Sequence, residues 1–214
     1  MNKSDHIPAP AVRRLSLYLR QLELFHGSDR KTVSSKQLGE ALSLSDAQVR
    51  KDLAYFGQFG HPGVGYRVPE LILRVRRILG TDRKTHVALV GLGNLGRALL
   101  SFRGFSNKGF EVVAVFDKDP AKIGREIEGG GGLRAQRLEE LPAAVRTHDI
   151  RLGILAVPAP AAQAVAELMV AGGIRGILNF APVRLQLGPE TAVSSVDLAV
   201  YIEQLSFQLS GAMS

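Results

Sequence analysis

Residues 86–117 read HVALVGLGNLGRALLSFRGFSNKGFEVVAVFD, and this stretch decides the fold. The apolar run at 87–90 is too short for a helix and too uniformly apolar for a strand with one wet face, so it predicts a strand buried on both faces. A glycine-rich turn, a helix and a second apolar run ending at Asp117 follow it. This order predicts an α/β fold with a Rossmann-like, doubly wound parallel sheet.

Each glycine of the turn has its own predicted role. Gly91 makes the tight turn, Gly93 leaves room for a pyrophosphate beside the backbone, and Gly96 lets the following helix pack closely on the strand. The helix opens at the next residues, so its free N–H groups face the phosphate position. The predicted phosphate-binding residues are Gly91, Leu92, Gly93, Asn94, Leu95 and Gly96. The alternative is a purely structural glycine turn, which the βαβ context disfavours.

Asp117 lies 21 residues after Gly96, where a carboxylate accepts hydrogen bonds from the adenosine ribose of a dinucleotide. A carboxylate there would repel the 2′-phosphate of NADP(H), so the sequence favours NADH or NAD+ as cofactor. The neighbouring Lys118 is also expected at the site, and its charge leaves NADP(H) open as an alternative.

Two later strands, over 150–157 and 176–180, end in residues that suit the same site. In open α/β sheets, ligands bind beyond the carboxyl ends of the strands. The residues expected there are Val157, Pro158, Asn179 and Phe180. Asn179 has an alternative role, which is to cap its own turn.

The composition limits the classes of function. The 214 residues are 45% apolar and include no cysteine, which excludes a disulfide framework, a thiol nucleophile and thiolate metal sites. The N-terminus lacks a secretory pattern, and the longest apolar runs fall short of the roughly 20 residues of a membrane helix. We therefore expect a cytoplasmic protein without a membrane partner.

Positive charge is concentrated before the nucleotide motif. Residues 1–80 hold 13 Lys and Arg against 7 Asp and Glu, a net charge of +6, whereas residues 81–214 hold 14 against 13. A nucleic acid would therefore meet the first 80 residues. An ordinary solvated surface is the alternative that charge alone leaves open.

Two capping boxes predict a helix-turn-helix in this basic part. A serine is followed three residues later by glutamine at 34–37 and again at 45–48, which predicts capped helices over 34–42 and 45–56. The short turn between them is typical of a helix-turn-helix. The alternative is an αα-hairpin whose polar face is merely wet.

The exposed face of the second helix suits DNA. It offers amide, cationic and small apolar groups, which can meet base edges and phosphates in a major groove. The glycine-rich ribbon at 57–67 resembles the wing of a winged helix, with a plain surface hairpin as the alternative. The predicted DNA-binding residues are Ser34, Gln48, Arg50, Lys51, Tyr55, His61 and Arg67.

Charge and periodicity both change after Gly80, which predicts a domain boundary there. The resulting segments are a winged helix DNA-binding domain at 1–80, a Rossmann NAD(H)-binding domain at 81–196 and a terminal helix at 197–214. Asp197 is the predicted N-cap of that helix. Its broad apolar face would pack either on its own sheet or on a second subunit.

No residue pattern supports hydride-transfer catalysis. None of the four tyrosines has a lysine four residues later, and none of the five histidines lies at the carboxyl end of a predicted strand. No metal-ligand cluster is visible either. We therefore predict no catalytic residue and no metal, and a nucleotide that is sensed and not consumed.

Several motifs, in order along nearly the whole chain, resemble the bacterial Rex family of redox-sensing transcriptional repressors. They are VRKDLAYFGQFG (49–60), GVGY (63–66), GLGNLG (91–96), VFDKDP (115–120), VPAPAAQ (157–163), GILNFAPV (176–183) and VDL with LSF (196–207). The resemblance implies a homodimer that binds a pseudo-palindromic operator through its winged helices and is released when NADH binds the Rossmann domain. It also implies that the last helix is exchanged between subunits.

The chain departs from the family pattern at one position. Near the nicotinamide the family often has a tyrosine where this chain has Phe102, which has no hydroxyl for a hydrogen bond in the redox switch. Phe102, Asp197 and Tyr201 are the residues expected at the switch and the dimer contact. Two alternatives are a small NAD-dependent oxidoreductase with a basic N-terminal domain and a structural nucleoid protein that ignores nucleotide.

Overall fold

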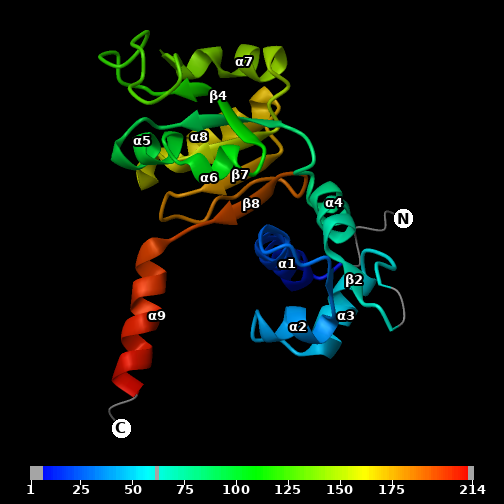
Figure 1. Cartoon of the computed structure of the whole chain (residues 1–214). Coiled ribbons are helices and arrows are strands. Elements are labelled where there is room, and N and C mark those ends of the chain that lie inside the picture. The colour runs from blue at the N-terminus through cyan, green and yellow to red at the C-terminus, as the bar shows by residue number, and fades with distance from the viewer. Residues whose placement is uncertain (1–6, 61–62, 212–214) are drawn as a thin grey trace. The chain divides into compact units, whose positions relative to one another are not determined.

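The computed structural model describes residues 7–60 and 63–211. The chain divides into two compact units, Met1–Arg83 and Lys84–Ser214 (Figure 1). His61, one of the predicted DNA-binding residues, lies outside the described residues.

The first unit combines helices with a short two-stranded ribbon. Its helices are α1 (Ala9–Gly27), α2 (Ser35–Glu40), α3 (Asp46–Ala54) and α4 (Val68–Leu79). Strands β1 (Thr32–Val33) and β2 (Tyr66–Arg67) pair antiparallel. The glycine-rich segment leads into β2, so α2 and α3 are followed by a small ribbon and the predicted winged helix-turn-helix is confirmed.

The core of this unit follows the helical spacing of the sequence. Leu15, Tyr18 and Leu22 of α1 are fully buried, because residues three and four apart share one face of a helix. Arg14 of α1 is half-buried. Its side chain is 26% exposed, and its guanidinium pairs at 2.5 Å with the fully buried carboxylate of Asp52 on α3.

The two predicted capping boxes differ. The Ser34 hydroxyl accepts from the backbone N–H of Gln37, whose side chain accepts in return from the backbone of Ser34. Ser45 likewise accepts from the backbone N–H of Gln48 at 3.1 Å. The predicted return bond, from the backbone N–H of Ser45 to the Gln48 side chain, is wrong. The Gln48 amide instead donates to a carboxylate one turn later in α3. Both helices also end earlier than the sequence predicts.

The second unit is the predicted doubly wound sheet. Its strands are β3 (Thr85–Val90), β4 (Phe110–Phe116), β5 (Ala135–Gln136), β6 (Leu152–Leu155), β7 (Gly176–Asn179) and β8 (Ala192–Ser195). All of them pair in parallel, in the order β5-β4-β3-β6-β7-β8. The order reverses between β3 and β6, and a ligand crevice is expected at that switch point.

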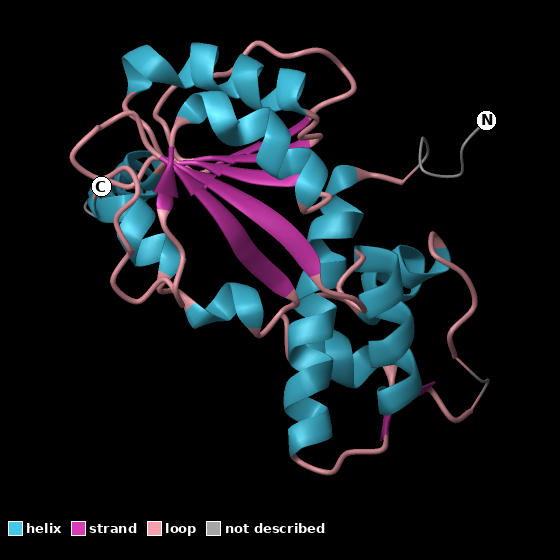
Figure 2. Ribbon diagram, turned by 90° about the horizontal axis from the view of Figure 1, so that it is seen from above, coloured by secondary structure: helices cyan, strands magenta, loops and turns pink. Residues whose placement is uncertain are grey.

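Helices cover both faces of this sheet (Figure 2). They are α5 (Asn94–Leu100), α6 (Arg103–Ser106), α7 (Leu141–Thr147) and α8 (Ala159–Gly172), with a 3-10 turn at Leu138–Glu140. Val87 and Leu89 of β3 join the apolar cluster that includes α5 and α6. Ala88 and Val90 join the cluster with α7 and α8. Strand β3 is therefore buried on both faces, as its uniformly apolar sequence predicts.

Helix α9 (Leu198–Gly211) follows the edge strand β8 and extends away from the sheet (Figure 1). Asp197 caps it, accepting from the backbone N–H of Ala199 at 3.0 Å. The described side chains of α9 are exposed, so it does not pack on its own sheet. Within residues 7–60 and 63–211, no helix combines the length and apolarity needed to cross a membrane.

Candidate nucleotide-binding and DNA-binding sites

A crevice of about 730 Å³ lies at the carboxyl ends of the central strands, within the size range of small-molecule sites. Its lining residues are Val90, Gly91, Gly93, Asn94, Leu95, Asp117, Lys118, Asp119, Pro120, Lys122, Leu138, Ala156, Val157, Pro158, Ala161, Val165 and Phe180. The structure thus brings most of the predicted cofactor-binding residues together. Leu92, Gly96 and Asn179 do not line the crevice.

The three glycines of the turn have separate structural reasons. Gly91 has a φ of +101°, and a Cβ there would collide with the carbonyl oxygen of Ala156. A Cβ on Gly96 would overlap the carbonyl oxygen of Gly91, so this glycine allows α5 to pack closely. Gly93 is different, because a Cβ there meets nothing within 4 Å and would occupy the crevice. Gly93 therefore keeps space free for a ligand and is not required by the fold.

Asp117 holds this turn in place. Its buried carboxylate accepts from the backbone N–H of Leu92 at 2.7 Å, from the backbone N–H of Asp119 at 2.9 Å and from Lys122 Nζ at 3.0 Å. Burial alone would raise the pKa of Asp117, but the backbone N–H groups and Lys122 hold this pKa below its ordinary value. Asp117 is thus an ionised residue that positions the glycine turn after β3. Lys122 is not predicted from the sequence.

Asn179 lies at the end of β7 with its side chain fully buried. Its amide nitrogen donates to the carbonyls of Ala181 and Val183, and its amide oxygen accepts from the backbone N–H of Ala181. These contacts make it the cap of its turn. Asn179 thus has the turn-capping role, and it is not among the residues that line the crevice. Its contact with a coenzyme stays a prediction.

Helix α3 presents cations to solvent. Lys51 and Tyr55 are exposed, and no acidic side chain of the described residues forms an ion pair with Lys51. Arg50 is also exposed, but its guanidinium binds Asp46 at 2.6 Å and Ser35 at 3.2 Å. Lys51 is therefore an exposed cation of α3 that, unlike Arg50, has no acidic partner among the described residues.

Three other predicted DNA-binding residues, Ser34, Gln48 and Arg67, have local partners. The Ser34 hydroxyl is used in its capping box, and Arg67 pairs with the exposed Glu70 at 3.1 Å. Gln48 is half-buried and donates to a buried carboxylate of its own helix. The α3 surface and the ribbon thus belong to one compact unit whose exposed groups include both amide and cationic side chains.

The buried carboxylate is that of Asp52, which the sequence analysis missed. It accepts from Arg14, from the hydroxyl of Tyr18 at 2.7 Å and from Gln48. The group links α1 to α3 across 38 positions of sequence. A charged residue next to a leucine in VRKDL gives no sequence signal for burial.

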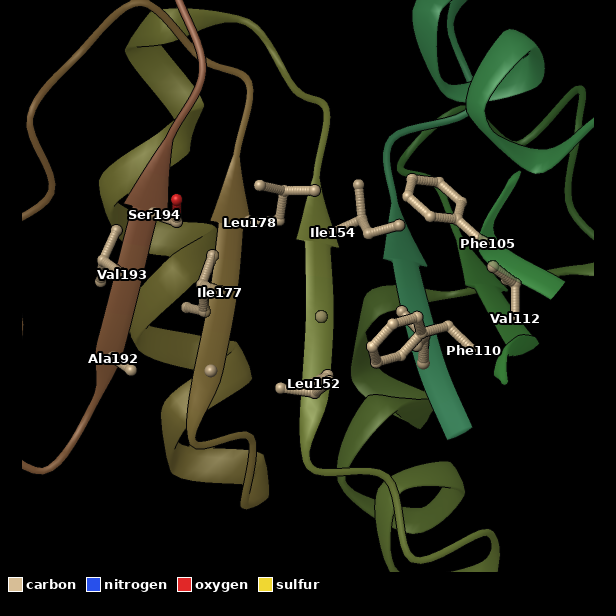
Figure 3. A pocket seen from close by; sticks show the side chains of 13 residues that line it. Phe105, Phe110, Val112, Leu152, Ile154, Ile177, Leu178, Ala192, Val193 and Ser194 are labelled. Carbon is tan, nitrogen blue, oxygen red and sulfur yellow. The ribbon is translucent and has the colours of Figure 1, made fainter. Parts of the chain in front are cut away.

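A second pocket, of about 370 Å³, lies on the sheet face that α5 and α6 cover only in part. Its lining is almost wholly apolar and spans strands β3, β4, β6, β7 and β8 (Figure 3). Phe105, Phe110, Leu152, Ile177 and Val193 are among its residues. The face is thus an apolar groove whose edge is the exposed strand β8.

Of the three expected switch and dimer residues, Phe102 and Tyr201 are exposed and Asp197 is half-buried. Phe102 is 57% exposed and its ring meets Phe105 edge-on, with 5.2 Å between ring centroids. Tyr201 is 51% exposed on α9. In the part of the chain that the structure describes, no group of three His, Asp or Glu side chains lies close enough to hold a metal ion.

Comparison with known proteins decides the family. A model described as a CoA binding domain matches residues 82–183, and one described as a putative DNA-binding protein N-terminus matches residues 6–54. The redox-sensing transcriptional repressor Rex of Desulforamulus reducens is 45% identical over 208 residues, which cover 97% of this chain and 98% of that protein. The chain belongs to the Rex family.

Other Rex proteins match equally completely. The Rex repressor of Chloroflexus aurantiacus is 41% identical over 210 residues and 98% of each chain. A Rex-family repressor called RSP, solved with β-NAD+ and operator DNA, superposes with a TM-score of 0.91 at 32% identity, covering 97% of this chain and 94% of that one. The same repressor with β-NADH gives a TM-score of 0.85 at 30% identity, covering 97% and 96%. These Rex relatives are named as transcriptional repressors and not as enzymes.

Proposed function

We propose that this chain represses transcription as a homodimer that binds operator DNA and releases it when NADH binds. The observation that carries the proposal is the match to RSP over the full length of the chain, because RSP has been solved with operator DNA, with NAD+ and with NADH. A repressor acts where the chromosome lies, so we infer a cytoplasmic location.

The proposed coenzyme site is the crevice beyond β3. Gly91 and Gly93 let a pyrophosphate approach the backbone, and the residues around Asp117 would hold the adenosine end. The walls formed by Val157, Pro158 and Phe180 are apolar. Apolar walls would favour the uncharged ring of NADH over the positively charged ring of NAD+. A redox sensor needs that preference.

The proposed DNA-binding surface is α3 with the ribbon. Lys51 would contact phosphate, Arg50 could exchange its bond to Asp46 for a contact with DNA, and Tyr55 is exposed beside them. Arg67 lies at the base of the ribbon that would act as the wing. His61 belongs to the same proposed wing.

The proposed dimer contact involves α9. Leu198, Ile202, Leu205 and Leu209 are 58–72% exposed, and Phe207 on the opposite side of the helix is 78% exposed. An exposed surface with this many large apolar side chains marks a site that another chain covers. We propose that α9 packs against a second copy, whose apolar groove at β6, β7 and β8 offers a matching surface. This gives residues 197–214 their role in dimerisation, after DNA binding by 1–80 and coenzyme binding by 81–196.

Repression and coenzyme binding must be linked through the dimer. The arrangement that cannot bind DNA must bind NADH more tightly than the competent arrangement does, and DNA must reciprocally weaken NADH binding. A coupling free energy of ~1–3 kcal/mol would change operator affinity about 5- to 150-fold. Phe102 supplies no hydroxyl to this coupling. Titration of labelled palindromic DNA with the protein, with and without NADH, tests the proposal.

A further inference from the structure

Asp52 gathers four hydrogen-bond donors around one buried carboxylate. Arg14 donates from Nε at 2.5 Å and from Nη2 at 2.9 Å, the Tyr18 hydroxyl donates at 2.7 Å, and Gln48 donates from Nε2 at 2.7 Å. The Asp52 side chain is 0% exposed. Of these partners, Gln48 is the one that also lies on the proposed DNA-binding side of α3.

The carboxylate is ionised in the folded protein. Burial by itself would raise the pKa of Asp52, but the hydrogen bonds from Arg14, Tyr18 and Gln48 outweigh burial and leave this pKa below its ordinary value. An ionised carboxylate can only accept hydrogen bonds. The side-chain amide of Gln48 must therefore turn its NH2 group toward Asp52.

This contact fixes which end of the amide faces outward. With Nε2 held by Asp52, the acceptor Oε1 of Gln48 points away from the carboxylate, and no described residue donates to it. Gln48 is half-buried, one position before the buried Val49 and three positions before the exposed Lys51. Oε1 of Gln48 is thus a hydrogen-bond acceptor of α3 whose orientation is fixed by Asp52.

We propose that Gln48 reads an operator base through this acceptor and that Asp52 is the positioning residue that sets its orientation. The inference rests on the proposed function, because it requires α3 to enter a major groove. Adenine and cytosine offer an exocyclic amino donor there, whereas guanine O6 and thymine O4 are acceptors that would face Oε1. The second N–H of the amide remains compatible with adenine N7. Gln48 therefore selects for adenine or cytosine.

Asp52→Asn tests this orientation with little change of shape. The asparagine oxygen can keep the contacts that Oδ2 makes with Arg14 Nε and Tyr18. Its NH2 group takes the place of Oδ1, gives up the contact with Arg14 Nη2 and donates to Gln48. The Gln48 amide then turns over and presents NH2 outward. The preferred base at that position should change from adenine or cytosine to guanine or thymine.

The experiment selects binding sites for the full-length protein from DNA in which every position of the half-site is varied. In the wild type, one position per half-site should prefer adenine or cytosine by about 2- to 10-fold, the worth of one hydrogen bond. Gln48→Ala should flatten that position alone. Asp52→Asn should invert it, and the double variant should match Gln48→Ala there. Gln48→Met, which keeps the side-chain length but has neither the amide donor nor the amide acceptor, should flatten the same position even if Asp52→Asn does not fold.

Three results would overturn the inference. The position flattened by Gln48→Ala could prefer guanine or thymine in the wild type, Gln48→Ala could flatten no position, or Gln48→Met could keep the amino-base preference. An effect of Asp52→Asn that persists without the Gln48 amide would reduce Asp52 to a structural role and overturn its positioning role. A wild-type protein that selects no DNA sequence would instead contradict the proposed function itself.

Discussion

The backbone N–H of Leu92 donates to the buried carboxylate of Asp117 across 2.7 Å. This bond joins the turn after β3 to the end of β4, the two neighbouring strands whose carboxyl ends border the crevice. Asp117 was expected only to face a ribose. In the structure it also fixes the loop that would surround the pyrophosphate, so coenzyme binding should depend on it in two ways.

Asp117→Ala should weaken NADH binding by about tenfold or more, because hydrogen bonds to a charged group contribute ~1.5–3 kcal/mol each. Calorimetric titration with NADH measures the loss. Glu111→Ala is the matched control, since Glu111 lies on the same strand but at the solvent-exposed end, paired with Lys84. Unchanged NADH affinity in Asp117→Ala would contradict this account of the turn.

Gly93→Val and Gly91→Val should separate binding from folding. Gly93 has room for a side chain, so Gly93→Val should keep its melting temperature but lose NADH affinity and the NADH response of DNA binding. Gly91→Val should destabilise the fold, because a strained backbone costs ~1–3 kcal/mol and the side chain would strike Ala156. Thermal melting beside NADH titration checks both. Equal destabilisation by the two substitutions would refute the distinction.

Lys51→Ala should weaken operator binding while NADH affinity stays at the wild-type value. Each dimer would lose two phosphate contacts, so the slope of log affinity against log salt should become shallower by about 2. Fluorescence anisotropy at several salt concentrations measures the slope. Lys84→Ala removes an exposed cation from the other unit and should leave the slope unchanged. A steady slope in Lys51→Ala would place the phosphate contacts elsewhere.

The Asp52 cluster should make the first unit sensitive to acid. The pKa of Asp52 is lower in the folded protein than its unfolded value of about 3.9. Its contribution to the free energy of unfolding is therefore complete above that value and is lost as pH falls through the lower, folded pKa. Urea unfolding between neutral pH and pH 3 measures the loss, which should be smaller in Asp52→Asn. An equal pH dependence in both proteins would show that Asp52 is not the linked group.

The sequence predicts those features of the fold that depend on a few neighbouring residues. Leu89 and Val90 point to opposite faces of β3 and join different apolar clusters, which a continuous apolar run at 87–90 implies. Gly91 and Gly96 stand where a side chain would strike the backbone. Such constraints depend on a few neighbouring residues, so a pattern can reveal them.

Contacts between distant segments were not predictable in this way. Asp52 and Arg14 are 38 positions apart, and only the packing of α1 on α3 shows that they meet. The carboxylate of Asp52 also accepts from the amide of Gln48, so this amide does not complete the expected capping box with Ser45. Because Asn179 ends a strand, the sequence predicts it at the crevice. In the structure both its amide nitrogen and its amide oxygen are hydrogen-bonded to the turn after β7.

We propose that one chain couples coenzyme binding to operator binding, and this coupling can be measured. Its most direct measurement is the affinity of the full-length protein for a labelled palindromic operator across a series of NADH concentrations, with NAD+ run in parallel. The account predicts that saturating NADH lowers operator affinity about 5- to 150-fold and that NAD+ does so much less. Operator affinity that is the same with and without saturating NADH would contradict it.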